Sequence, residues 1–193
     1  MRREVRWRTA TGEGLEHLTL SADSEGGIRA ESVVIGDRDG LFYGVRYSIR
    51  CDRGWRVSAF EVADTTGRTL SMRSRAAGAW VYADGASAPA FDGCLDIDLS
   101  GTPFTNTLPI RRADLAGGEA GRPSTFRMLF VPFDTLEPTV EAQHYTPLGP
   151  RLVRFETADR DFAADLPIDE DGLVLDYPAL FRRLPAPITS RLP

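Results

Sequence analysis

The 193-residue sequence contains no lysine, because all 23 of its basic side chains are arginine, and it has few cysteines and histidines. Without an amine side chain, both Schiff-base chemistry and a P-loop lysine are excluded. Cys51 and Cys94 are too few for a disulfide scaffold. His17 and His144 are too few for a multi-histidine metal site. We therefore expect a protein that holds no metal ion and needs no cofactor.

Long hydrophobic runs and blocks of basic residues are also missing. No apolar run approaches the roughly 18 to 20 residues that a membrane helix needs. A net charge of -5 without clustered arginines argues against a nucleic-acid partner. The first residues include no apolar stretch typical of export signals, so we expect a cytoplasmic protein with reduced thiols. The length suits one domain over residues 1–193.

Alternation of apolar and polar residues is clearest in residues 43–51, which predicts a strand with one apolar face. An Asp-Arg-Gly turn follows, and residues 55–62 return as the second strand of a hairpin. Similar short runs, separated by turn residues, occupy residues 5–9, 15–21, 69–75, 79–83, 94–99, 126–133, 152–156 and 162–168.

These runs predict a mainly all-β fold of about ten strands. We expect a curved antiparallel sheet, or an open or partly closed β-barrel. Residues 177–184 are the exception, because Tyr177, Leu180, Phe181 and Leu184 recur at three- and four-residue spacing. This spacing predicts a short C-terminal amphipathic helix that covers one side of the sheet.

Arginines mark one face of the predicted hairpin. Arg46 and Arg50 lie on the polar side of residues 43–51. On a concave face their guanidinium groups would bind a phosphate, a carboxylate or a sugar head group, whereas on a convex face they would be solvated. Trp80 and Tyr82, in the run 79–83, are aromatic candidates for the same cavity.

Other polar candidates lie in two less generic segments. Residues 102–112 combine three threonines, two prolines and the chain's single asparagine, Asn106, which suits either a structured connection or a ligand contact. Residues 143–146 contain the single glutamine, Gln143, followed by His144 and Tyr145. A histidine beside a phenol is suited to proton transfer near neutral pH, although a lone histidine in a strand is more often structural.

Carboxylates add a second candidate for acid–base chemistry. Asp96 and Asp98 are two residues apart on a predicted strand, so they share one face at about 6.5 to 7 Å. Such a pair suits acid–base work, but alternation of aspartate with leucine and isoleucine is also usual for a half-buried strand. Asp98 with Arg111 is the second pair to test.

Two consecutive segments, residues 92–98 and 102–112, resemble a bacterial family named putative glycolipid-binding proteins. Weaker matches lie before these segments, at residues 78–80, and after them, at residues 143–146 and 171–178. They stand in the order expected of the family, so the resemblance spans nearly the whole chain. The family is similar in fold to half-barrel lipoprotein carriers, which implies a curved sheet around an apolar cavity. The first residues of this sequence show neither the apolar export signal nor the lipid-attachment cysteine of those carriers, so we do not expect a periplasmic shuttle.

Three functions follow from this reading. The first is a binder of an amphiphilic or lipid-like small molecule, with Arg46, Arg50, Trp80, Tyr82, Asn106, Gln143, His144 and Tyr145 lining its cavity. The second is a cofactor-independent cyclase, dehydratase or isomerase for a polyketide- or terpenoid-like substrate, of the kind found in secondary metabolism. It would use His144 with Tyr145, or Asp98 with Arg111. The third is a structural or protein-interaction module, and the oligomeric state is left open.

Overall fold

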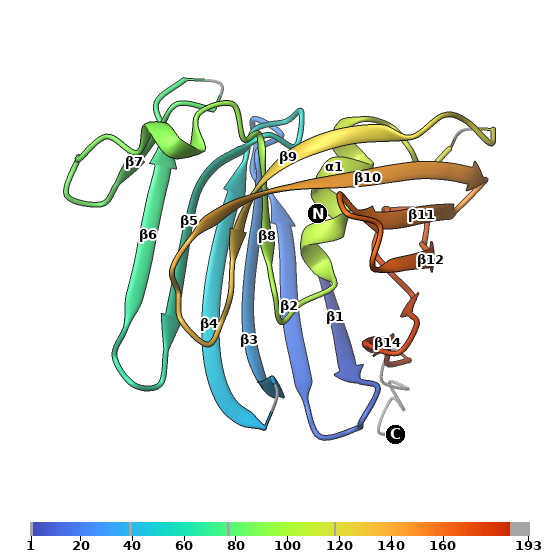
Figure 1. Ribbon diagram of the computed structural model, residues 1–193, viewed down its shortest axis with the longest axis horizontal. Coiled ribbons are helices and arrows are strands. Elements are labelled where there is room, and N and C mark those ends of the chain that lie inside the picture. The colour runs from blue at the N-terminus through green and yellow to red at the C-terminus, as the bar shows by residue number, and fades with distance from the viewer. Residues whose placement is uncertain (1, 39, 77, 118, 186–193) are drawn as a thin grey trace.

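The structure, a computed structural model, describes residues 2–38, 40–76, 78–117 and 119–185. Within these residues the chain forms two β-sheets and one short α-helix (Figure 1). The all-β class with curved antiparallel sheet is therefore confirmed. The described residues form fourteen strands rather than about ten. Two long strands, β3 (Ile28–Arg38) and β10 (Thr139–Gly149), lie outside the predicted runs, and the segment 177–184 contributes to a strand hairpin in place of a helix.

The larger sheet has nine strands, and each neighbouring pair in it is antiparallel. In spatial order they are β13 (Asp176–Tyr177), β14 (Phe181–Arg183), β1 (Arg2–Thr9), β2 (Leu15–Ala22), β3 (Ile28–Arg38), β4 (Leu41–Cys51), β5 (Val57–Asp64), β6 (Thr69–Ser74) and β7 (Trp80–Tyr82).

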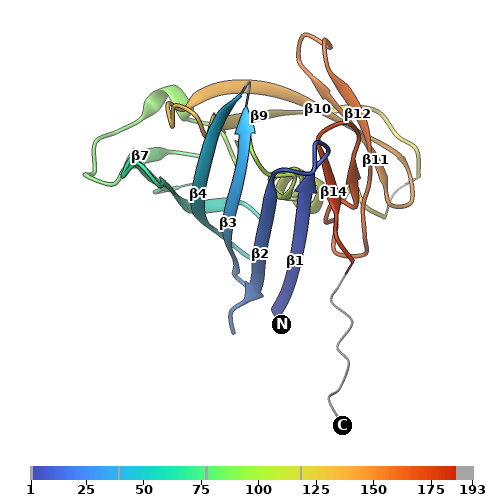
Figure 2. The ribbon, with the colours of Figure 1, turned by 90° about the horizontal axis from the view of Figure 1, so that it is seen from below.

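The smaller sheet has five strands. In spatial order they are β12 (Ala163–Pro167), β11 (Leu152–Thr157), β10 (Thr139–Gly149), β9 (Ser124–Val131) and β8 (Asp96–Leu99). The pair β8–β9 is parallel, because the chain crosses over between them through the helix. Figure 2 shows the nine-stranded sheet as a curved trough, with β9 and β10 crossing its open side.

The helical segments lie in the connections on either side of β8. They are η1 (Pro89–Phe91), η2 (Phe104–Asn106) and α1 (Thr107–Arg112), and α1 is enclosed between the two sheets (Figure 2). Pro109 is accommodated because it lies in the first turn, where its backbone needs no N–H donor. Leu108 and Ile110 are fully buried, so burial of these side chains stabilises a helix of only six residues.

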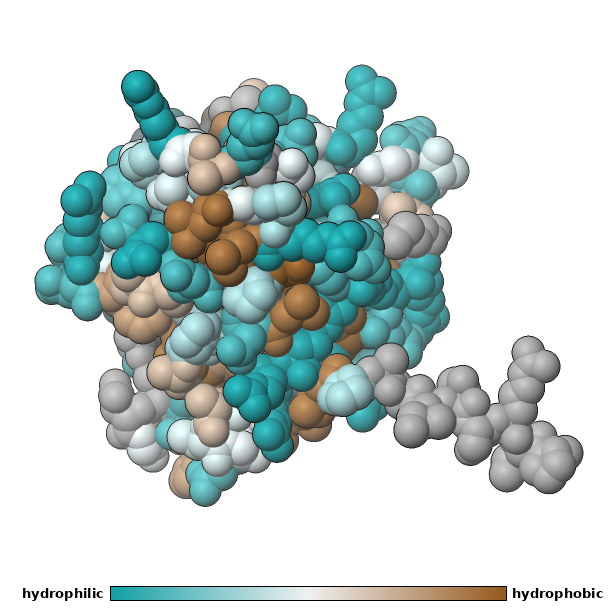
Figure 3. Space-filling model, turned by 90° about the vertical axis from the view of Figure 1, so that its right-hand side faces the viewer, coloured by the Kyte–Doolittle hydropathy of each residue, from teal (hydrophilic) through white to brown (hydrophobic). Residues whose placement is uncertain are grey.

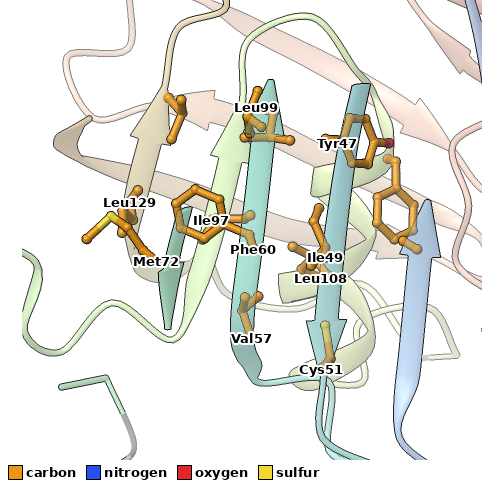
Figure 4. Close-up of a cluster of buried hydrophobic side chains, with 14 of the residues drawn as sticks. Tyr47, Ile49, Cys51, Val57, Phe60, Met72, Ile97, Leu99, Leu108 and Leu129 are labelled. Carbon is orange, nitrogen blue, oxygen red and sulfur yellow. The ribbon is translucent and has the colours of Figure 1, made fainter. Parts of the chain in front are cut away.

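The main core lies between the sheets and follows the predicted alternation of β4. Tyr47, Ile49 and Cys51 point inward, while Arg46 and Arg50 are exposed. Figure 4 shows these inward side chains facing Ile97 and Leu99 of β8, Leu108 of α1 and Leu129 of β9, with Val57, Phe60 and Met72 of β5 and β6 beside them. The interior of the trough is therefore filled by side chains at this end.

The helix predicted for residues 177–184 is wrong. Tyr177 pairs with Phe181 across a tight turn, in which Ala179 has a left-handed backbone (φ 65°). β14 then pairs with β1 through Trp7 and Arg183. Without β14, β1 would be an edge strand with unpaired N–H and C=O groups, and pairing with β14 supplies partners for them. Three- and four-residue spacing over eight residues is too short to distinguish the two outcomes.

Candidate functional site

A cavity of about 500 Å³ lies between the two sheets, a size within the usual range for ligand sites. We call it the inter-sheet cavity. It is bounded by the ends of β1, β3 and β4, by β8 to β11 and by the β13–β14 turn. Its lining residues are Thr9, Ala10, Thr11, Asp37, Tyr43, Asp98, Leu99, Ser100, Thr102, Asn106, Phe130, Glu141, Gln143, Phe155, Thr157, Phe162, Tyr177, Ala179, Leu180 and Phe181.

Aromatic rings form one wall of the inter-sheet cavity. Phe155 of β11 lies 6.1 Å from Phe162 and 6.1 Å from Tyr177, measured between ring centroids. Tyr177 in turn lies 6.3 Å from Phe181 of β14. The contacts of Tyr177 with Phe155 and Phe181 are edge-to-face and the contact between Phe155 and Phe162 is tilted, and such contacts fix the rings against one another. Leu180 adds an aliphatic side chain that is 40% exposed, so this wall suits an alkyl chain or an apolar ring that enters from solvent.

Apolar surface also reaches solvent on this side of the molecule. Figure 3 shows hydrophobic side chains gathered among hydrophilic ones, on the face that carries β11, β12 and β14 in Figure 1. On the same side of the cavity, Phe162 and Phe181 are partly exposed, so part of the aromatic wall reaches solvent.

Another part of the lining is polar and centres on Asp98 of β8. Thr105 donates a hydrogen bond to Asp98 Oδ1 at 2.8 Å, and the amide of Gln143 donates to Oδ2 at 2.7 Å. The Tyr145 hydroxyl lies behind them, 3.0 Å from Asn106 Oδ1 and 3.2 Å from Gln143 Oε1. The amide of Asn106 donates to the Pro103 carbonyl, which fixes its orientation. These contacts hold Asp98, Asn106 and Gln143 at the cavity wall.

Burial raises the pKa of the Asp98 carboxyl above its ordinary value, and the hydrogen bonds from Thr105 and Gln143 only partly offset this effect. Such a carboxyl group takes up a proton more readily than an exposed aspartate. Asp98 can therefore either accept hydrogen bonds from a bound molecule or, when protonated, donate one to it.

A second buried carboxyl group, Glu16 of β2, lies just behind the cavity wall. Ser32 and Tyr47 donate to its Oε1 at 2.9 and 2.5 Å, and Thr102 donates to Oε2 at 2.6 Å. Burial raises the pKa of Glu16 to about 7 despite these bonds. Because Thr102 also lines the inter-sheet cavity, Glu16 links three strands of the larger sheet to the segment that leads into the helix.

Three of the eight predicted ligand-binding residues lie at or directly behind the wall of the inter-sheet cavity. Asn106 and Gln143 line the inter-sheet cavity, and Tyr145 supports them from behind. Trp80 instead belongs to the main core, where its ring meets Phe60 and its indole N–H donates to the Cys94 carbonyl at 2.9 Å.

The remaining aromatic and arginine candidates lie elsewhere. Tyr82 packs against the main core at the far end of the larger sheet. Arg46 and Arg50 are exposed on its outer face, where Arg46 pairs with Glu61 at 3.3 Å. The arginine-rich face is thus the solvated side of the sheet, and alternation alone had left this question open.

The two pairs predicted for acid–base chemistry are not brought together. Consecutive strand residues point to opposite faces, so Tyr145 is buried while His144 bonds to Thr125 at 2.9 Å on the other face. Asp98 lines the inter-sheet cavity, whereas Arg111 lies 5.2 Å over the Trp55 ring and lines a separate cavity of about 120 Å³.

The residues missed by sequence reasoning belong to the aromatic wall and to Glu16. The spacing of residues 177 to 181 predicts a helix, so the sequence does not reveal that Tyr177 lies beside Phe155 and Phe181. Glu16 did leave a signal, because it shares the alternation of Leu18 and Leu20 and so lies on the buried face of its strand. An acid in phase with buried leucines indicates a buried carboxyl group.

Comparisons with known proteins place the chain among relatives. A family model described as "Putative glycolipid-binding" matches residues 4–183. A solved crystal structure of a DUF1089 family protein from Pseudomonas aeruginosa is 38% identical, with a TM-score of 0.74 over 89% of this chain and 92% of that chain. No curated protein matches. In the part of the chain that the structure describes, no helix has the length and apolar character needed to cross a membrane.

Proposed function

The chain belongs to the family described as putative glycolipid-binding, and from this premise we propose that it binds an amphiphilic small molecule in the inter-sheet cavity. The observation that carries the proposal is the division of the lining into two parts. Phe155, Phe162 and Phe181 offer an apolar surface, and Asp98 and Gln143 offer hydrogen-bonding groups. Ligand sites commonly combine an apolar cavity with a few fixed polar groups.

Each of these two parts of the lining suits a different part of the ligand. An alkyl tail or apolar ring would pack against the aromatic wall, where burial contributes roughly 25 cal/mol per Å² of apolar surface removed from water. The head group would face Asp98, Asn106 and Gln143. Hydrogen bonds already fix these three side chains, because Asp98 accepts from Thr105 and Gln143 and Asn106 accepts from Tyr145. Little conformational entropy of these side chains is therefore lost when the ligand binds.

The experiment is a titration with N-phenyl-1-naphthylamine, an uncharged dye that fluoresces in apolar surroundings. We expect saturable binding of one dye per chain. Phe130→Ala removes a ring from the cavity wall and should raise the dissociation constant about tenfold, which corresponds to roughly 1.4 kcal/mol. Phe42→Ala is the matched control, because Phe42 is 86% exposed at the tip of the β3–β4 hairpin.

Two results would oppose the proposal. One is the absence of saturable binding to the intact protein. The other is an equal effect of Phe130→Ala and Phe42→Ala, which would place the dye on the outer surface. Circular dichroism of both variants would establish that each has folded.

A second candidate function, a cofactor-independent enzyme, is favoured by one observation, the raised pKa of the Asp98 carboxyl at the cavity wall. A carboxyl group poised to exchange a proton is suited to general acid–base catalysis. Native mass spectrometry of protein purified from its own host, followed by organic extraction, tests this candidate. A carrier would release the molecule unchanged after incubation, whereas an enzyme would convert it to a product of different mass or, for an isomerisation, of different retention.

A further inference from the structure

Arginines gather on the outer face of the larger sheet, although the whole chain has a net charge of -5. Residues that pair across neighbouring antiparallel strands share a face, so the strand registers define which side chains of β1 to β6 lie there. Seven exposed arginines lie on this face against four carboxylates. They are Arg2, Arg6, Arg8, Arg29, Arg46, Arg50 and Arg73, against Glu4, Glu31, Asp37 and Glu61. The outer face is therefore positive in an acidic protein.

Fewer than half of these arginines are paired with a carboxylate. The ion pairs are Arg2–Glu4 and Arg29–Glu31, each at 2.7 Å, and Arg46–Glu61, at 3.3 Å. Arg6 instead donates to Nδ1 of His17 at 3.2 Å. Among the described residues, no carboxylate pairs with Arg8, Arg50 or Arg73. Their guanidinium groups remain available to an anion from outside.

Exposed apolar side chains lie at one end of the same face. Val33 and Ile35 of β3 are each 56% exposed, and Ile35 pairs with the exposed Leu15 of β2. Leu41, which is 64% exposed, and Phe42 lie at the tip of the β3–β4 hairpin (Figure 1). We call these five residues the apolar patch. Five of the eight large hydrophobic side chains exposed in the described parts of the chain belong to it, so they are concentrated rather than scattered.

The combination of positive charge and apolar surface distinguishes among possible partners. A second copy of this chain, docked through the same face, would bring arginine against arginine. A nucleic acid would neutralise the arginines but would leave the apolar patch against phosphate and water. A bilayer that contains anionic lipids supplies negative head groups for the arginines and, directly beneath them, an apolar layer for the patch.

We propose that the outer face of the larger sheet docks on anionic membrane surfaces, with the apolar patch inserted among the lipid head groups and the arginines bound to their phosphates and carboxylates. The inference goes beyond the proposed function, because docking requires neither the inter-sheet cavity nor its ligand. Asp37 and Tyr43 of the same hairpin line that cavity, so docking would place the cavity close to the lipid.

Co-sedimentation of the full chain with vesicles tests the docking. One set of vesicles is pure phosphatidylcholine, and the other contains about 30 mol% phosphatidylserine. We expect the partition coefficient to be about tenfold larger, or more, on the anionic vesicles. This difference should disappear in about 1 M sodium chloride, where charges are screened within about 3 Å. Equal partitioning into both sets, or none into either, would overturn the inference and leave the proposed function standing.

Substitution of unpaired arginines tests the role of the outer face. The double variant Arg8→Gln, Arg50→Gln breaks no ion pair with the described carboxylates, and it should lower the partition coefficient about fivefold or more. The matched control is Arg122→Gln, Arg160→Gln, which makes the same change of charge at exposed positions beside β9 and β11. Circular dichroism would establish that both fold. Equal losses in the two variants would overturn the assignment to the outer face.

Fluorescence tests the insertion of the apolar patch. The three native tryptophans, Trp7, Trp55 and Trp80, are buried, so the indole of Phe42→Trp would be the exposed one. We expect its emission to shift to shorter wavelength on anionic vesicles. Leu148→Trp, at an exposed position of β10, is the control and should show no shift. The absence of a shift in Phe42→Trp would overturn the insertion.

The rejected partners supply two further outcomes. Binding of a DNA duplex by the full chain, without a shift of Phe42→Trp on vesicles, would replace the membrane by a nucleic acid. A dimer in sedimentation velocity that Phe42→Ser dissociates would replace it by a second copy. Either result would overturn the inference.

Discussion

Glu16 shows how one residue can make the stability of this protein depend on pH. Its pKa rises from 4.5 to about 7 on burial. Between these values the folded chain holds a proton that the unfolded chain has lost, so stability falls as pH rises and levels off above pH 7. The slope is about 1.4 kcal/mol per pH unit, and the total is of the order of 3 kcal/mol.

Urea unfolding of the wild type and of Glu16→Gln at several pH values between 4.5 and 7.5 measures this contribution. The difference in unfolding free energy between the two proteins should change by a few kcal/mol across the range. Taking the difference also cancels the contributions of Asp96 and Asp98, whose pKa values are raised by burial as well. Glu61→Gln, an exposed substitution, should show no such change. A constant difference for Glu16→Gln would contradict the argument.

Tyr145 carries a second prediction at the residue scale. Its ring centroid lies 5.5 Å from that of Phe126 and 5.4 Å from that of Phe155, and Tyr145→Phe keeps these contacts. The change removes the donor shared by Asn106 and Gln143, and a buried acceptor without a partner costs about 1 to 3 kcal/mol. Denaturation by urea should show this loss. Tyr82→Phe, in the partly buried β7, should cost less than about 0.5 kcal/mol.

At the scale of elements, the ion pair between Arg112 and Asp96 connects the short helix α1 to β8. Arg112, the last residue of α1, binds the buried Asp96 and packs 5.2 Å from the Phe126 ring of β9. Removing one partner of a buried pair leaves an uncompensated charge and costs about 3 to 5 kcal/mol. We therefore expect Arg112→Met to lower the unfolding free energy by that amount.

The comparison is Arg154→Met, which breaks the exposed pair with Asp165 between β11 and β12. An exposed pair contributes about 0 to 1 kcal/mol, so this variant should unfold near the wild-type midpoint. The same urea titration measures both variants. If Arg112→Met and Arg154→Met lower the unfolding free energy by similar amounts, the buried pair of Arg112 stabilises the protein no more than an exposed pair does.

The elements also show where sequence reasoning succeeds. Strand β4 was predictable because one face is buried and the other solvated, which leaves a regular alternation. Helix α1 was not predictable, because threonine and proline are poor helix formers and the burial of Leu108 and Ile110 overrides their local preference. The hairpin β13–β14 was misassigned because only the neighbouring β1 makes its extended backbone favourable.

For the candidate site, residue types that occur only once in the sequence indicated part of the cavity lining. Asn106 and Gln143, each the only one of its kind, line the inter-sheet cavity, and Asp98 lies beside them. The positions of Arg46 and Arg50 depend on which way the sheet curves. Alternation along a strand separates two faces but does not say which of them is concave.

At the scale of the whole molecule, the buried hydrophobic side chains form two cores. One core fills the trough of the larger sheet, and a second core lies against the smaller sheet around Tyr145 and Phe155. Helix α1 joins them, because Leu108 belongs to the first core and Ile110 to the second. The inter-sheet cavity takes its lining from both sheets, so it exists only when they are assembled.

A molecule that binds there should stabilise the whole fold, because it binds the folded chain and not the unfolded one. At a free ligand concentration of 100 times the dissociation constant, the gain is about 2.7 kcal/mol. We expect decyl β-D-glucopyranoside, kept below its critical micelle concentration, to raise the melting temperature in scanning calorimetry by several degrees. Glucose alone has the head group without the tail and should leave the melting temperature unchanged. If the glucoside binds but the melting temperature stays constant, the probe occupies a surface that survives unfolding, and the inter-sheet cavity is not its site.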